Sequence, residues 1–142
     1  MFQRLAGAYL IAVSVAVAAY FIINPLHAAS YDPERVWYVL DILMVVAAVP
    51  ALVFNTRRKL SAGRAAKVGP LASSYWEANI AFYATVGVTI LLLHSWFSIL
   101  ALGLDADDHQ GFVKWAIVDT LLPLVYGATG WALWRAGGRP VA

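Results

Sequence analysis

Two apolar segments of similar sequence each contain one aspartate. WYVLDIL at positions 37–43 contains Asp41, and WAIVDTL at positions 115–121 contains Asp119. A charged carboxylate at the middle of a membrane costs about 2.5 kcal/mol or more, so such groups normally face a bundle interior or water and are neutralised or paired. These two residues are therefore the first candidates for chemistry in this sequence.

Histidines extend the candidate site. With a helical rise of about 1.5 Å per residue, His94 reaches the depth of Asp41 and Asp119, and His27 marks the end of the first apolar segment. Imidazole and carboxylate together bind copper, zinc or iron, or relay protons. A purely structural interpretation stays open, in which each aspartate accepts a hydrogen bond from a buried tyrosine, tryptophan or serine and fixes the helix register. The least favoured alternative is a haem held between His27 and His94.

One proline distinguishes the two aspartates. Pro123 has no N–H group to donate to the carbonyl four residues earlier, which belongs to Asp119. The free carbonyl and the carboxylate form an oxygen-rich position suited to water, a cation or a donor from a partner. Pro50 frees the carbonyl of Val46 in the same way, but without an acidic companion. Asp119 is therefore the stronger candidate of the two.

The composition predicts that these residues lie in a membrane. Of 142 residues, 62% are hydrophobic and 13% are charged, and the mean hydropathy is +0.72, whereas a soluble domain has about a quarter charged residues. Spans of about 20 apolar residues must be helical in lipid. We expect a single all-α membrane domain over residues 1–142, with transmembrane helices at 5–26, 36–55, 75–103 and 112–134. The absence of cysteine excludes disulfides, thiolate metal sites and Fe–S clusters.

The basic residues predict the orientation of the spans. Eight of the ten Lys and Arg residues lie on one side of the predicted membrane, and Arg35 and Lys114 lie on the other. The positive-inside rule then places both termini and the 56–74 loop in the cytoplasm of a multi-pass protein of the plasma or inner membrane. We expect these basic residues to contact anionic lipid rather than nucleic acid. Those of the loop are Arg57, Arg58, Lys59, Arg64 and Lys67.

The second and fourth spans suggest a repeat. A shift of 78 positions aligns Trp37 with Trp115, Asp41 with Asp119, Leu43 with Leu121 and Arg57 with Arg135. The pattern fits two tandem helical hairpins related by an axis along the membrane normal. The alternative is convergent chemistry at helix ends, with tryptophan outside and arginine inside, although this alternative leaves the shared aspartate unexplained.

Small residues predict how the helices pack into a four-helix bundle. Ala8, Ala12 and Ala16 form a ridge on the first span, and Gly127 and Gly130 offer close approach on the fourth. Such faces exceed what four helices need among themselves, so some of them are available to other integral membrane subunits.

The sequence favours a non-catalytic accessory subunit of a larger membrane complex, because it has almost no extramembrane part and an excess of small-residue faces. It contains no phosphate-binding glycine loop, nucleophile elbow or metalloprotease helix, so catalysis by the chain alone is not expected. One alternative is a small membrane protein with a metal or proton-relay site at Asp41, His94 and Asp119, with His27. A further alternative is a small repeat-built transporter that works as an oligomer.

Overall fold

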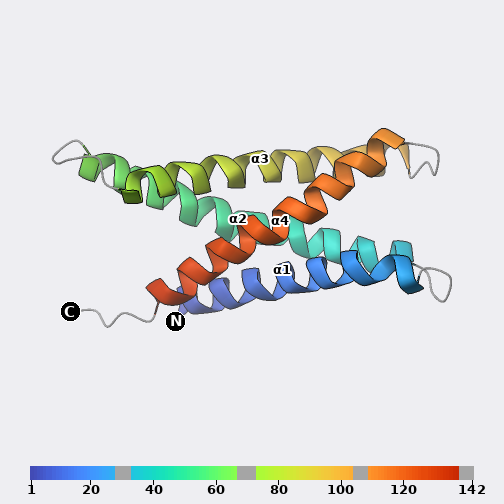
Figure 1. Ribbon diagram of the computed structural model, residues 1–142, viewed down its shortest axis with the longest axis horizontal. Coiled ribbons are helices and arrows are strands. Elements are labelled where there is room, and N and C mark those ends of the chain that lie inside the picture. Colours follow the sequence, from blue (N-terminus) through green and yellow to red (C-terminus); the bar gives the residue numbers. More distant parts are fainter. Residues whose placement is uncertain (28–32, 67–72, 104–108, 138–142) are drawn as a thin grey trace.

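Four long helices make up the fold (Figure 1). The computed structural model describes residues 1–27, 33–66, 73–103 and 109–137, and all regular structure in these ranges is helical. The helices are α1 (Phe2–His27), α2 (Pro33–Ala66), α3 (Ser73–Leu102) and α4 (His109–Ala136). Each of them is long and apolar enough to cross a membrane. The predicted all-α class and the four spanning-length helices are confirmed.

The helix α2 continues well beyond its predicted end. Residues 56–66 were expected to belong to a basic loop, but the chain stays helical to Ala66. Leucine, alanine, arginine and lysine, which dominate this stretch, are good helix formers. An ion pair of 3.1 Å between Arg58 and Glu77 also ties the extension to α3. Arg57, Lys59 and Arg64 are therefore helical residues, while Lys67 lies outside the described part of the chain.

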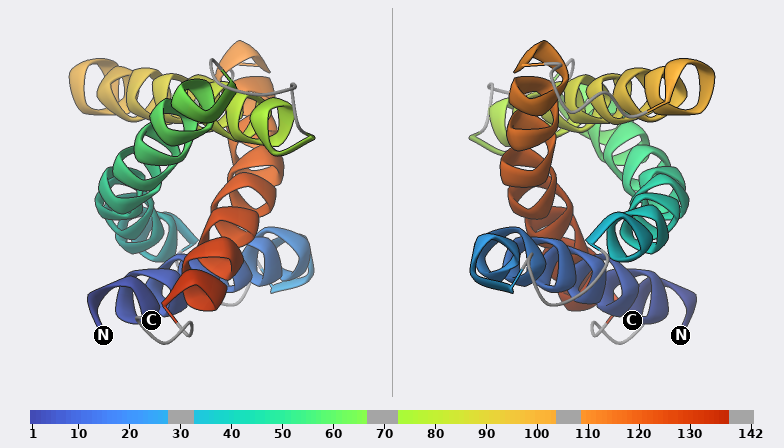
Figure 2. Two further views of the ribbon diagram at one scale, coloured as in Figure 1. Left: turned by 90° about the vertical axis from the view of Figure 1, so that its left-hand side faces the viewer. Right: turned by 90° about the vertical axis from the view of Figure 1, so that its right-hand side faces the viewer.

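The two hairpins of the chain cross one another. We call the end that holds Phe2, Ala66, Ser73 and Ala136 the basal end, and the opposite end the apical end (Figure 1). The most extensive contacts join α1 to α4, the first and last helices, followed by those between α2 and α3, which are consecutive in the chain but belong to different hairpins. The end-on views place α1 and α3 on opposite sides of the bundle, with α2 and α4 between them (Figure 2).

Glycines set the distance between α1 and α4. A Cβ atom at Gly7 would lie 2.7 Å from the carbonyl oxygen of Gly130, and one at Gly130 would lie 2.8 Å from the carbonyl oxygen of Gly7. Gly127 lies against Ser14 of α1, with 3.5 Å from its ideal Cβ position to the Ser14 Cβ. Both predicted glycines of α4 thus lie in the α1–α4 interface.

Most of the predicted alanine ridge of α1 lies outside the α1–α4 interface. Ala12 and Ala16 are exposed, and Ala8 is half-buried. The inward face of α1 carries Leu10 and Val17 instead. Because Gly7 and Gly130 already bring the backbones together at the basal end, larger side chains fill the widening space further along the pair.

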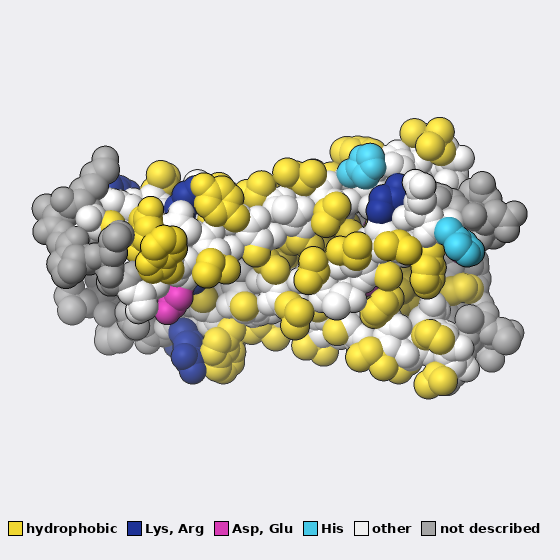
Figure 3. Space-filling model, turned by 45° about the horizontal axis from the view of Figure 1, so that its top comes forward, with side chains coloured by type: hydrophobic (Ala, Val, Ile, Leu, Met, Phe, Trp, Pro, Cys, Tyr) yellow, Lys and Arg dark blue, Asp and Glu magenta, His cyan; other side chains and the backbone are white. Residues whose placement is uncertain are grey.

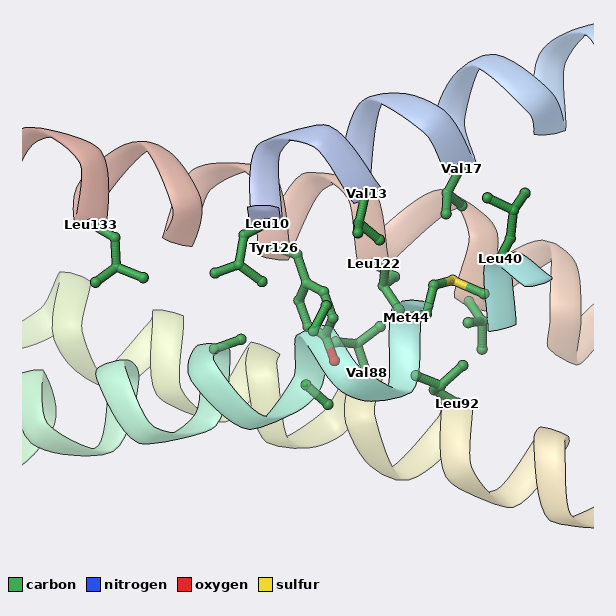
Figure 4. Close-up of a cluster of buried hydrophobic side chains, with 14 residues drawn as sticks. Leu10, Val13, Val17, Leu40, Met44, Val88, Leu92, Leu122, Tyr126 and Leu133 are labelled. Atoms are coloured by element: carbon green, nitrogen blue, oxygen red, sulfur yellow. The ribbon is translucent and has the colours of Figure 1, made fainter. Parts of the chain in front are cut away.

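The inward faces of α2 and α4 follow the same spacing. Buried residues recur at alternating intervals of three and four, the seam expected for packed helices. The 78-residue shift that aligns Asp41 with Asp119 also superimposes these positions, which are Asp41, Met44, Ala48, Ala51 and Asn55 on α2 and Asp119, Leu122, Tyr126, Thr129 and Leu133 on α4. Figure 4 shows Met44, Leu122 and Tyr126 pointing into one core with Val88 and Leu92 of α3.

We predict opposite effects for glycine substitutions inside and outside the α1–α4 interface. Gly7→Ala and Gly130→Ala each press a methyl group against backbone atoms of the other helix, so each should lower the free energy of unfolding by about 1–3 kcal/mol. Gly87→Ala is the matched control, because nothing lies within 4 Å of its ideal Cβ position. It should raise stability by up to about 1 kcal/mol through helix propensity. Thermal unfolding of the purified protein by circular dichroism measures all three, and equal effects would contradict the close contact.

Candidate functional site

The bundle interior contains a pair of carboxyl groups. Asp41 of α2 is 6% exposed and Asp119 of α4 is 5% exposed. Their charges are close enough to interact. The Oδ1 atom of each residue is buried without a hydrogen-bond partner. Buried polar atoms are normally satisfied, so two unpartnered carboxylate oxygens in one region require an explanation.

Apolar side chains surround the pair. Leu40 and Met44 flank Asp41 on α2, and Val118 and Leu122 flank Asp119 on α4; all four belong to the hydrophobic core. Such surroundings offer the carboxylates little solvation, which makes each negative charge costly.

A tryptophan lies one helical turn to the apical side of each aspartate. Trp37 and Trp115 are both half-buried and pack against the core. The ring of Trp37 also meets the edge of Tyr20 of α1, with 4.9 Å between centroids. Residues four apart share a helix face, so each indole lies between its aspartate and the apical end of the bundle.

Ser95 of α3 is a third buried polar residue in this region. It is 2% exposed, and its Oγ has no hydrogen-bond partner. The hydroxyl groups of Thr89 and Tyr126 lie 3.1 Å apart and fix the register of α3 against α4. Because these helices are antiparallel, Ser95, six residues after Thr89, is level with Asp119, seven residues before Tyr126. Sequence reasoning missed Ser95, although its spacing from Val88 and Leu92 marks it as an inward position.

The backbone adds one more oxygen. Pro123 lies inside α4, so the carbonyl of Asp119 receives no N–H from the residue four positions later. The carboxyl groups of Asp41 and Asp119, this carbonyl and the Ser95 hydroxyl are buried oxygen groups at about the same level of the bundle, on three helices. We call Asp41, Ser95 and Asp119 the aspartate site.

Of the two predicted histidines, His94 does not join the aspartate site. His94 is exposed, whereas its neighbour Ser95 is buried, because successive helical residues point about 100° apart. His27 ends α1, and its side chain lies outside the described part of the structure. Within the described residues, no three His, Cys, Asp or Glu side chains come together in a way that would hold a metal ion. The structure therefore brings Asp41 and Asp119 together and leaves His94 on the outer surface.

A second buried polar cluster lies nearer the basal end. The Asn55 Nδ2 donates hydrogen bonds to Thr85 Oγ1 at 2.8 Å and to Thr129 Oγ1 at 2.9 Å. The two threonine hydroxyls donate in turn to the carbonyls of Ala81 and Val125. One amide thus joins α2 to both α3 and α4, while the Asn55 Oδ1 remains unpartnered.

Sequence reasoning missed this cluster because it placed Asn55 at the very end of the second span. The signal was its position 14 residues after Asp41, about four helical turns further along the same face.

The polar clusters are separated by apolar layers. Met44, Leu92 and Leu122 lie on the apical side of Tyr126 (Figure 4). Each of them is three residues from a member of the aspartate site, on the side of that member toward Tyr126. The interior is therefore suited to binding at one level, not to a continuous file of hydrogen bonds along the bundle. Comparisons of the chain with protein-family models, with curated proteins and with solved structures give no match.

Proposed function

We propose that the four helices cross the plasma or inner membrane with the basal end in the cytoplasm. Large hydrophobic side chains are exposed along all four helices, and Figure 3 shows them over the whole length of one face. Cation–π contacts of basic residues lie at the basal end, where the Arg4 guanidinium lies over the ring of Trp134 and the Arg135 guanidinium over the ring of Trp131. Tryptophan and arginine side by side are typical of the cytoplasmic interface.

In this orientation the aspartate site lies in the outer half of the membrane, and its proposed function is to bind a proton or a small hard cation such as Na⁺. The observation that carries the proposal is the pair of buried, unpartnered Oδ1 atoms on Asp41 and Asp119. Two carboxylates in an apolar interior need compensating positive charge, and ionisable residues inside membrane bundles commonly mark ion or proton sites.

The donor set favours this ligand class over a transition metal. Carboxylate, carbonyl and hydroxyl oxygens suit hard cations, whereas copper and zinc sites in proteins rely on imidazole or thiolate. The exposed position of His94 and the absence of cysteine leave oxygen donors alone among the described side chains of the aspartate site. A backbone carbonyl freed by an interrupted helix is also the kind of group that coordinates Na⁺ in transporters.

The symmetry of the contacts supports a two-hairpin repeat. Exchange of α1 with α3 and of α2 with α4 maps the α1–α4 interface onto the α2–α3 interface, and these two are the most extensive. Asp41 belongs to the first hairpin and Asp119 to the second, so the aspartate site lies where the repeats meet. Coupling-ion sites of repeat-built transporters occupy this position.

A second candidate function is that of an accessory subunit. It is favoured by the exposed face of α1 that carries Ala12, Ala16 and Ala19. Small residues at helical spacing allow close packing of transmembrane helices, and this face is not used within the bundle. A neighbouring helix of another membrane protein would fit against it.

The orientation predicts a labelling pattern. The chain contains no cysteine, so a single introduced cysteine reports one position without background. Ser61→Cys at the basal end should react with a membrane-impermeant maleimide only after the membrane is opened. Gln110→Cys at the apical end should react in intact cells. The reverse pattern would overturn the orientation, and labelling of neither position after permeabilisation would overturn the exposure of these ends.

The aspartate site predicts stabilisation by its ligand. Unfolding of the purified protein is followed while Na⁺ replaces choline at constant ionic strength and at several pH values. A ligand at 100 times its dissociation constant stabilises the folded state by about 2.7 kcal/mol. We expect a rise in unfolding temperature with Na⁺ or with proton concentration in the wild type, and its loss in both Asp41→Asn and Asp119→Asn.

Glu34→Gln is the control for this experiment, because it removes an exposed carboxylate from the same helix as Asp41. It should leave the response unchanged. A rise in unfolding temperature with Na⁺ at constant pH identifies Na⁺ as the ligand, and a rise with proton concentration at constant Na⁺ identifies the proton. If the double variant Asp41→Asn, Asp119→Asn responds like the wild type to both, the aspartate site binds neither ligand.

The accessory-subunit function predicts a stable partner. Purification from native membranes at native abundance, in a mild detergent, should recover the chain with another integral membrane protein. Ala16→Phe should weaken this association and leave the unfolding temperature unchanged, because Ala16 is exposed. Recovery of a lone monomer would exclude this second function.

A further inference from the structure

A groove opens between α1 and α2 in the basal half of the bundle. Its volume is about 1060 Å³. The first wall comes from the start of α1, including Phe2, Leu5 and Ala6, and the second from α2 between Val46 and Ala65, with Leu133 and Ala136 of α4 also contributing. The groove exists because α1 packs mainly on α4 and α2 mainly on α3, so that α1 and α2 part toward their basal ends (Figure 1).

The groove is polarised along its length. Its deep part, toward the middle of the bundle, is lined by Val46, Val49, Pro50 and Val53. The one hydroxyl group in this part belongs to Tyr9 and donates to the carbonyl of Leu43 at 2.9 Å. The deep part therefore offers apolar contact and no spare hydrogen-bond donor from Tyr9.

The basal part of the groove is cationic. Arg57 and Arg58 lie next to each other among its lining residues, and no lining residue is an aspartate or glutamate. The Arg58 guanidinium also forms an ion pair of 3.1 Å with Glu77 of α3, which compensates part of its charge and leaves Arg57 as the stronger phosphate contact of the two. Arginine binds phosphate through a planar fork of N–H donors, so two adjacent arginines form a strong phosphate contact.

We propose that this groove binds one anionic phospholipid of the cytoplasmic leaflet, with its phosphate at Arg57 and Arg58 and an acyl chain along the valines. Arg57 lies eleven positions after Val46, a distance of about 16 Å along the helix. Half of the hydrocarbon core of a bilayer measures about 15 Å, so the groove matches a single acyl chain in length. Basic pockets between helices on the cytoplasmic side recognise anionic head groups.

Charge favours a lipid over a protein helix as the occupant. A second helix against the groove would need acidic side chains to face two guanidinium groups, whereas a lipid phosphate supplies the negative charge at the correct depth. The inference depends on the membrane orientation proposed above and not on the aspartate site. The cysteine-labelling pattern tests that orientation separately, so failure of either proposal is recognised on its own.

Native mass spectrometry of the protein released from nanodiscs tests the proposal. The nanodiscs contain phosphatidylcholine with a minor fraction of phosphatidylglycerol. We expect one phosphatidylglycerol retained per chain in preference to phosphatidylcholine. One arginine near the membrane surface contributes about 1 kcal/mol to such binding, so Arg57→Gln should lower the retained fraction of phosphatidylglycerol about fivefold.

Two further variants separate charge from shape. Arg135→Gln is the matched control, because it removes a basal arginine that does not line the groove, and retention should stay at the wild-type level. Val49→Trp places a large ring in the deep part without changing charge, and should lower retention of both lipids. Equal retention in the wild type, Arg57→Gln and Arg58→Gln overturns the proposal, and so does a second protein chain occupying the groove.

Discussion

One side-chain amide fixes the register of three helices. Both N–H groups of Asn55 are used, one toward Thr85 of α3 and one toward Thr129 of α4. An apolar exterior gives the helices no hydrophobic reason to prefer one register over another in lipid, so packing and interhelical hydrogen bonds must decide. Through this amide, Asp41, 14 residues from Asn55, and Asp119, ten residues from Thr129, come within about one turn of the same level.

The same exterior explains why the polar groups gather inside. Buried polar residues occur on all four helices, from Ser14 on α1 to Thr129 on α4, and most of them satisfy one another or a nearby carbonyl. The aspartate site departs from this rule, since three of its oxygen atoms are buried without partners. A bundle able to pair Asn55, Thr85, Thr89 and Tyr126 has the means to satisfy polar groups. The unpartnered oxygens at the level of Asp41 and Asp119 are the observation on which the proposed ligand rests.

Much of the architecture follows from composition and periodicity, and much of the site does not. The four helices, their approximate bounds and the approach of Asp41 and Asp119 are all readable from apolar run lengths and from the 78-residue shift. The exposure of His94 could not be predicted. The depth of a residue along a helix does not say whether its side chain points inward, because that depends on which other helices pack against it. The extension of α2 to Ala66 is not readable either, because it is tied to α3 by the Arg58–Glu77 ion pair. Ala12 and Ala16 were expected as packing residues. The closest α1–α4 contact is instead made by Gly7 and Gly130, and both alanines are exposed.

The exchange of partners between hairpins has a consequence for assembly. If the helices insert into a membrane as proposed, insertion precedes their association with one another. In this bundle the two largest interfaces, α1 with α4 and α2 with α3, both join different hairpins. Under the proposed insertion, the first hairpin on its own would expose its main packing surfaces, including Gly7 and the buried face of α2, to lipid. The core needs side chains from all four helices, including Leu10, Met44, Leu92 and Leu122, so neither hairpin contains it alone.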